Sequence, residues 1–206
     1  MKNANKYAGR IIFLIILYQF IMSPDLFSQG FERVIVETYF ENKGKKIPEL
    51  PEDLKTYRIY IDLEPEYRLQ SVYGAPLHPF RFETSTTFYN HKWGNIIGDG
   101  LASTLSDSIS YMLDSYITIG AATDKYFGIP LMDDKDGSIF SSTLFNNADG
   151  LTENGRIPEI VFYELDKNIF TDNNSSIFES EDFLIGVFGG AKGPDDENRI
   201  LIAQLT

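Results

Sequence analysis

A short acidic run in the second half of the chain has the residue types of a cation site. Asp133, Asp134 and Asp136 stand close together and are followed by Gly137. Carboxylate oxygens suit calcium, and glycine allows the chain to turn sharply around the ion. The run does not fit an EF-hand, because Thr143 stands where the bidentate glutamate belongs. We predict a calcium site of another kind here, and the alternative is an acidic turn.

Two aromatic residues have the chemistry of a ligand-binding platform. Trp93 is the only tryptophan and lies in residues 90–100, a glycine-containing stretch that predicts an exposed loop. Tyr60 is expected on the solvated face of its strand. Planar rings stack on sugar rings, and neighbouring polar groups bond the sugar hydroxyls. We predict both residues as ligand-binding; the alternatives are a plug at the end of the fold for Trp93 and a cross-strand packing role for Tyr60.

Motifs of common catalytic centres are absent from the sequence. His78 and His91 are the only histidines, which excludes a three-histidine zinc site, and there is no cysteine for disulfides or thiolate chemistry. Neither GxSxG nor the phosphate loop GxxxxGK[ST] occurs. A carboxylate pair for glycoside hydrolysis need not be close in sequence, so a hydrolase stays an alternative. We predict a non-enzymatic chain that requires no cofactor, with calcium as the one candidate ion.

The first 28 residues have the pattern of a signal peptide. Three basic residues precede an apolar block, residues 11–22, which is shorter than the roughly 20 residues of a membrane-spanning helix. We predict cleavage between Ser28 and Gln29, and the alternative is an uncleaved N-terminal anchor. The mature chain, residues 29–206, has no predicted membrane span.

The mature chain is strongly acidic. Without the leader, Lys and Arg fall from 18 to 15 and Asp and Glu from 30 to 29, which gives a net charge of −14. This balance argues against nucleic acid as a partner, because phosphate recognition depends on clustered basic side chains. The 178 residues from 29 to 206 suit one domain that buries about 70% of its unfolded surface.

Strand patterns dominate the mature chain. Polar and apolar residues alternate over 57–63, 67–73 and 80–87, with turn residues between them. These segments predict a three-stranded antiparallel meander with one buried and one solvated face. The segment 101–113 has apolar residues at helical spacing but also many Ser and Thr, which predicts at most a short helix.

Further strands are expected on both sides of this region. In residues 31–40 the candidates for burial are Val34, Val36 and Tyr39. The segment 182–189 is apolar enough to be buried on both faces. The remaining predicted strands are 116–120, 158–165 and 199–206. Seven or eight strands with Gly, Pro and Asn turns predict an all-β antiparallel sandwich of the jelly-roll or Greek-key type, formed by residues 29–206 as one domain.

Several segments resemble a module found in large secreted proteins of Bacteroidota that use the type IX secretion route. They are YRIYIDL, YRLQSVYGAP, the aromatic pair before Asn90, LDSYITIGAA, the GSI of residues 137–139, and NRILIAQLT. The similarity extends from about Val34 to the C-terminus. It implies an exported, surface-associated β domain, and the shared motifs are structural rather than catalytic.

These observations predict an exported, non-enzymatic module for adhesion to a surface or matrix, with a glycan or an extracellular protein as partner. The predicted location is extracellular or at the cell surface, and the periplasm is the alternative. The second hypothesis is a carbohydrate-binding module, which needs a row of exposed aromatic side chains or a calcium-supported loop on one face. The third is a glycan-active hydrolase, which needs two opposed carboxylates in a cleft.

Overall fold

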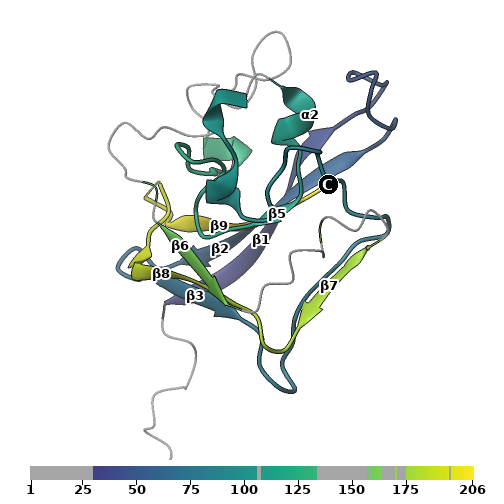
Figure 1. Ribbon diagram of the computed structural model, residues 1–206. Coiled ribbons are helices and arrows are strands. Elements are labelled where there is room, and N and C mark those ends of the chain that lie inside the picture. The colour runs from purple at the N-terminus through teal and green to yellow at the C-terminus, as the bar shows by residue number, and fades with distance from the viewer. Residues whose placement is uncertain are drawn as a thin grey trace, which may run out of the picture.

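The computed structural model describes residues 30–105, 108–133, 157, 159–163, 170, 175–194 and 196–206. They form the all-β antiparallel sandwich that the strand pattern predicted (Figure 1). The predicted signal peptide, residues 1–28, lies outside the described residues. Within the part of the chain that the structure describes, no helix is long and apolar enough to cross a membrane.

The first sheet has four strands in the order β1-β2-β9-β5. They are β1 (Phe31–Glu41), β2 (Lys55–Leu63), β9 (Arg199–Leu205) and β5 (Tyr116–Ile117). All neighbouring strands are antiparallel. β9 is buried along its whole length, because both faces of the sheet are covered at this strand. This explains why its sequence, RILIAQL, is mainly apolar instead of alternating.

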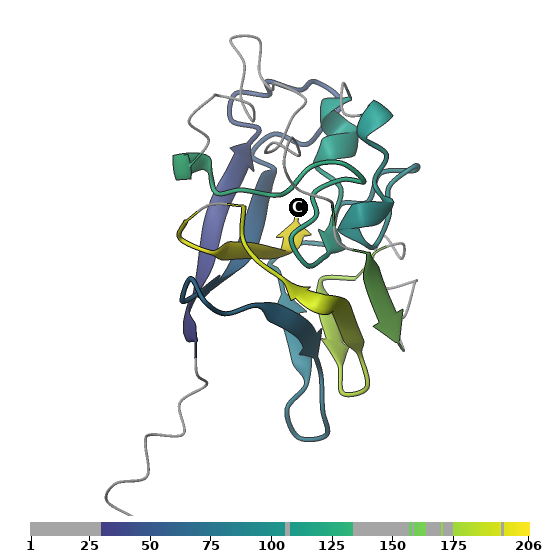
Figure 2. The same ribbon diagram turned by 90° about the vertical axis from the view of Figure 1, so that its left-hand side faces the viewer.

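A second layer packs on one face of the first sheet. It contains the three-stranded sheet β3-β8-β6 and the pair β4-β7. The strands are β3 (Leu69–Tyr73), β8 (Leu184–Ala191), β6 (Ile160–Tyr163), β4 (Phe80–Glu83) and β7 (Ile177–Ser180). Figure 2 shows the three-stranded sheet below the first sheet, and in Figure 1 β7 lies to the right of β3, β8 and β6.

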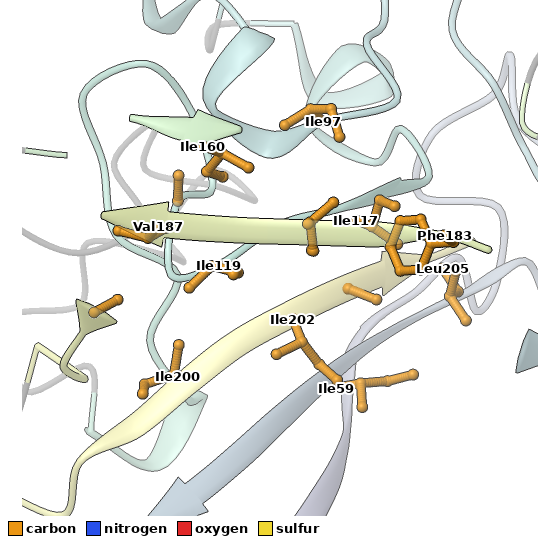
Figure 3. Packing of buried hydrophobic residues seen from close by; sticks show 14 of the residues in the cluster. Ile59, Ile97, Ile117, Ile119, Ile160, Phe183, Val187, Ile200, Ile202 and Leu205 are labelled. Atoms are coloured by element: carbon orange, nitrogen blue, oxygen red, sulfur yellow. The ribbon is translucent and has the colours of Figure 1, made fainter. Parts of the chain in front are cut away.

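The main hydrophobic core lies between these two layers (Figure 3). Ile59 and Ile202 from the first sheet belong to the same cluster as Val187 from the second layer. Aromatic rings fill the end near β4 and β7, where Phe183 lies 5.1 Å from Phe80 and 5.3 Å from Phe178 between ring centroids. Close packing of these large side chains joins the layers into one domain.

Short helical turns cover the opposite face of the first sheet. They are α2 (Ile109–Met112) and the 3₁₀ turns Gly98–Gly100, Ser103–Leu105 and Leu131–Asp133. Leu101, Tyr111 and Met112 form a second cluster with Tyr60 of β2 and Leu201 of β9. The expectation of at most a short helix in 101–113 is confirmed, since α2 has four residues.

The predicted three-stranded meander is wrong. β2 pairs with β1 and β9, β3 pairs with β8, and β4 pairs with β7. The turn at Glu64-Pro65-Glu66 therefore crosses between the layers, where the amide of Glu64 donates to the carbonyl of Gly30 over 2.9 Å. Alternation identifies a strand and its two faces, but it does not specify the neighbouring strand.

Burial was also predicted incorrectly in two strands. Val34 and Val36 are 52% and 63% exposed, because β1 is the outer strand of its sheet and these side chains lie beyond the packed core. In β8, Leu184 and Phe188 are exposed while Ile185 is fully buried. β8 is therefore buried on one face only, and its other face carries apolar residues in contact with solvent.

Candidate functional site

The only tryptophan is exposed on a loop that a buried carboxylate holds in place. Trp93 is 63% exposed, as expected for a loop residue. The Asp114 carboxylate accepts hydrogen bonds from the backbone amides of His91, at 2.6 Å, and Asn95, at 2.8 Å. A Cβ atom on Gly94 would lie 2.0 Å from Asp114 Oδ2. Only glycine allows the loop to approach the carboxylate this closely.

Burial changes the protonation of this carboxylate. It raises the pKa of Asp114 to about 7, although backbone amides of His91, Asn95 and Ser115 favour the charged form. The pKa of His91 is lowered by burial and by the charge of Lys92. The loop is thus anchored by a group that changes charge near neutral pH.

Polar and aromatic groups surround the indole of Trp93. The Lys92 ammonium lies 4.0 Å from the indole centroid, and the His91 ring meets the indole edge-on at 5.7 Å. His91 in turn contacts the ring of Tyr111 at 5.4 Å. Lys92 occupies one face of the indole through a cation–π contact. Ligand binding by Trp93 stays a prediction.

The prediction that Tyr60 faces solvent is wrong. Its side chain is fully buried, and its hydroxyl donates a 2.9 Å hydrogen bond to the carbonyl of Ile129. The same hydroxyl lies 3.4 Å from Glu37 Oε2. Tyr60 is covered because the helical turns pack on the sheet face that alternation had suggested would be wet. Its ring is not accessible for stacking on a ligand.

The acidic run that predicted a calcium site is described only at its first residue. Asp133 forms an ion pair with Arg199, whose guanidinium also lies 3.1 Å from Met132 Sδ. Asp134 and Asp136 lie outside the described residues. Among the residues that the structure describes, no three Asp, Glu or His side chains are grouped closely enough to hold a metal ion. Calcium binding by this run stays a prediction.

The outer face of the β3-β8-β6 sheet carries exposed aromatic side chains that the sequence analysis missed. Tyr73 and Tyr163, which are 61% and 64% exposed, both lie directly opposite Leu184 in the strand register. Further along β8, Phe188 is 88% exposed. We call these four residues the outer aromatic face. No signal in the sequence separated them from the core, because β8 is apolar at both odd and even positions.

The register makes this face shallow and uncharged at its centre. Tyr73 and Tyr163 are separated by the β8 strand, so their backbones lie about 9.6 Å apart, which is two strand spacings. The next outward row is Ser71, Gly186 and Val161. Gly186 contributes no side chain to this row, and the side chains of Ser71 and Leu184 lie beside it. The face can therefore accept a flat ligand across its strands.

A cleft of about 1020 Å³ opens between the first sheet and the segment that follows β4. Its apolar residues include Val36, Tyr57 and Leu205, and its hydroxyl groups come from residues 84–87. Three carboxylates also line it, namely those of Glu52, Asp53 and Glu83. Glu83 forms a 2.8 Å ion pair with Arg81. The four residues of the outer aromatic face carry no carboxylate, so the hydrolase alternative is tested first at this cleft.

Comparisons with known proteins give no family for this chain. No family model, curated protein or solved structure matches it.

Proposed function

We propose that the chain is a non-enzymatic interaction module that binds a glycan through the outer aromatic face. The observation that carries this proposal is the row Tyr73-Leu184-Tyr163, which lies on one face of a sheet, with Phe188 exposed further along β8. Burying a side chain of this size stabilises a protein by about 1.5–3 kcal/mol. A fold that leaves several of them together in solvent favours a ligand that covers them.

The chemistry of the face suits sugar rings. A pyranose ring has an apolar C–H face that stacks on aromatic side chains, and its hydroxyls bond to groups such as the tyrosine hydroxyl. The separation of Tyr73 and Tyr163, about two strand spacings, is close to the length of one disaccharide in an extended β-1,4-linked chain. The net charge of −12 for the whole sequence disfavours polyanionic glycans, so the proposed ligand is a neutral one.

An exported location, extracellular or at the cell surface, belongs to the same proposal. It is supported by the leader pattern in residues 1–28 and by the need of a glycan-binding surface to meet a matrix or another cell. An extracellular protein is the alternative partner. A protein would be expected to bind exposed aromatic residues through hot spots in pockets, and the shallow surface at Gly186 offers less of that shape.

Affinity electrophoresis against a panel of neutral soluble polysaccharides tests the proposal. We expect at least one polysaccharide to retard the protein, and we expect Tyr73→Ala with Tyr163→Ala to abolish the retardation. The matched control is Trp93→Ala, which removes an equally exposed aromatic ring from another part of the surface. Retardation that survives the tyrosine changes but is lost in Trp93→Ala would place the site on the Trp93 loop and contradict the proposal. Retardation by no glycan would also contradict it and favour a protein partner.

The same panel separates the calcium and hydrolase alternatives. Loss of retardation on adding a chelator, restored by calcium, would support an ion site that includes Asp133. New reducing ends in the retarded polysaccharide would show catalysis and contradict a purely binding role. The cleft carboxylates of Glu52, Asp53 and Glu83 would then be the first to replace.

A further inference from the structure

The outer strand of the first sheet has the properties of a pairing edge. Among the described residues, β2 is the only strand that pairs with β1, and Figure 2 shows β1 along the outer side of the molecule. β1 has eleven residues without proline, and its regular segment extends from Arg33 to Thr38 between two register shifts. Natural proteins often protect such edges with proline, bulges or charges, because an open edge is a template for another strand. In β1 the two register shifts lie near the ends, so the segment between them stays regular.

We propose that β1 pairs antiparallel with β1 of a second copy of this chain, about a twofold axis at Ile35. In this register Arg33 of one copy lies opposite Glu37 of the other. Val34 of one copy likewise lies opposite Val36 of the other. Opposite charges and paired β-branched side chains are the cross-strand neighbours that stabilise antiparallel sheets. A twofold interface presents every such pair twice.

The charges of β1 select this register over its neighbours. A twofold axis normal to the sheet must place one residue directly opposite its own copy. The reason is that residues opposite each other in an antiparallel pair project from the same face of the sheet. An axis at Arg33 would place two arginines opposite each other, and an axis at Glu37 would do the same with two glutamates. An axis at Val34 or Val36 would set Ile35 opposite a charged residue. Only the axis at Ile35 places opposite charges across from each other and apolar residues across from each other.

Both charged side chains already have a partner within their own copy, Asp62 of β2 for Arg33 and the Leu131 amide for Glu37. Arg33 Nε lies 2.8 Å from Asp62 Oδ2, and the Arg33 side chain is largely exposed. Glu37 Oε1 accepts a 2.7 Å hydrogen bond from the amide of Leu131. The remaining donors of the guanidinium fork can bond a second carboxylate.

Pairing would join the two first sheets into one continuous sheet of eight strands, given four in each copy. The axis is normal to the sheet, so the second layers of both copies lie on the same side. On the proposed function, both outer aromatic faces would then point in one direction. Two linked sites bind a flat polysaccharide surface more tightly than one, through a raised effective concentration.

Sedimentation equilibrium of the unaltered protein and two lysine variants tests the association itself. We expect a reversible dimer, and we expect Val36→Lys to weaken it about tenfold, because each of two symmetric valine pairs is lost. The control Leu77→Lys makes a similar change at an exposed turn between β3 and β4 and should leave the dimer intact. A protein that stays monomeric at about 100 μM, or variants that behave alike, would overturn the proposal.

Cysteine cross-linking tests the register, since the native sequence contains no cysteine. Val34→Cys and Val36→Cys proteins are mixed in equal amounts and oxidised mildly. Directly opposite residues have Cα atoms about 4.5–5.5 Å apart, which a disulfide can bridge. Two cysteines at the same position would lie more than about 7 Å apart and resist bridging. We expect the mixed 34–36 dimer to dominate. Same-position dimers in equal or greater amount would exclude the axis at Ile35.

Discussion

The carboxylate of Asp114 accepts a 2.6 Å hydrogen bond from the backbone amide of His91, which lies 23 residues earlier in the chain. A second bond, from the amide of Asn95, closes the loop between these two residues. The exposed Trp93 therefore lies on a loop whose shape depends on one buried side chain. The charge state of that side chain should be measurable in the stability of the whole domain.

The unfolding free energy should fall as the pH rises from about 4 to about 7. Burial raises the pKa of Asp114 to about 7 in the native state, whereas the unfolded chain ionises near the ordinary value of about 4. The native state thus keeps a proton that the unfolded state releases in this window, which costs up to about 4 kcal/mol by pH 7. Urea denaturation at a series of pH values measures this, and Asp114→Asn should remove most of that slope. Burial also raises the pKa of Asp99, which leaves a smaller fall of the same sign.

His91 must be separated from this effect. Its pKa is lowered in the native state, so its contribution has the opposite sign and stability rises as the pH approaches its ordinary value of about 6.5. His91→Gln removes this contribution and should make the fall assigned to Asp114 steeper. A pH profile that is unchanged in Asp114→Asn would show that the carboxylate is not the responsible group.

Replacing Gly94 by alanine should loosen the Trp93 loop. The new Cβ would overlap the Asp114 carboxylate, so the two amide bonds must lengthen or break, at a cost of about 1–3 kcal/mol. Thermal unfolding gives the loss of stability, and the fluorescence anisotropy of the only tryptophan reports the loop directly. Gly186→Ala is the milder comparison, since its Cβ would meet the Gln70 carbonyl oxygen at 3.3 Å, which needs only a small shift, against 2.0 Å at Gly94. Equal effects of the two changes would contradict this account.

Arg58 and Gln204 should be strongly coupled in a double-mutant cycle. Arg58 is fully buried, donates from Nε to Gln204 Oε1 over 2.8 Å and lies 3.7 Å above the ring of Tyr39. Gln204→Leu removes this acceptor and also the two bonds that the Gln204 amide donates to the carbonyls of Met112 and Asp114, which together we expect to cost about 3–5 kcal/mol. Arg58→Met together with Gln204→Leu should cost less than the sum of the single changes by about 1–3 kcal/mol. Additive costs, measured by urea denaturation, would exclude the coupling.

Asn42 should tolerate neither leucine nor aspartate. Its amide nitrogen donates to the carbonyls of Ile47 at 3.1 Å and Pro51 at 2.7 Å, and its oxygen accepts from the amide of Ile47 at 2.8 Å. Asn42→Asp keeps the shape but replaces the donor by an acceptor that faces carbonyl oxygens. We expect at least about 2 kcal/mol of lost stability in both variants. Thermal unfolding measures it, and a near-neutral Asn42→Asp would contradict the assigned bonds.

The sequence predicted the strands better than their partners. Alternation in residues 57–63 correctly separated Ile59 from Tyr60, because period two is a local property of a strand. It could not show that α2 and its neighbouring turns cover the face that Tyr60 occupies. Equally, nothing local to residues 67–73 indicated that β3 would pair with β8, since long-range register is decided by packing.

The candidate site was predicted only in part. Trp93 was expected on an exposed loop because glycine and polar residues surround it, and the structure places it there. Its anchor, Asp114, is distant in sequence and lies in no motif, so no pattern could connect the two. Phe188 and Leu184 were assigned to a buried strand, because apolar residues that face a ligand have the same composition as residues that face a core.

The central place of β9 has a consequence for the kinetics of folding. β9 comes later in the sequence than every other described strand, yet it lies between β2 and β5. While the ribosome is still adding residues 199–205, the first sheet lacks the strand that joins its two halves. Contacts such as that between Arg58 and Gln204 span 146 residues, and such high contact order slows the search for the native state. The first sheet can therefore close only after residues 199–205 have been synthesised, and we expect this step to take milliseconds to seconds.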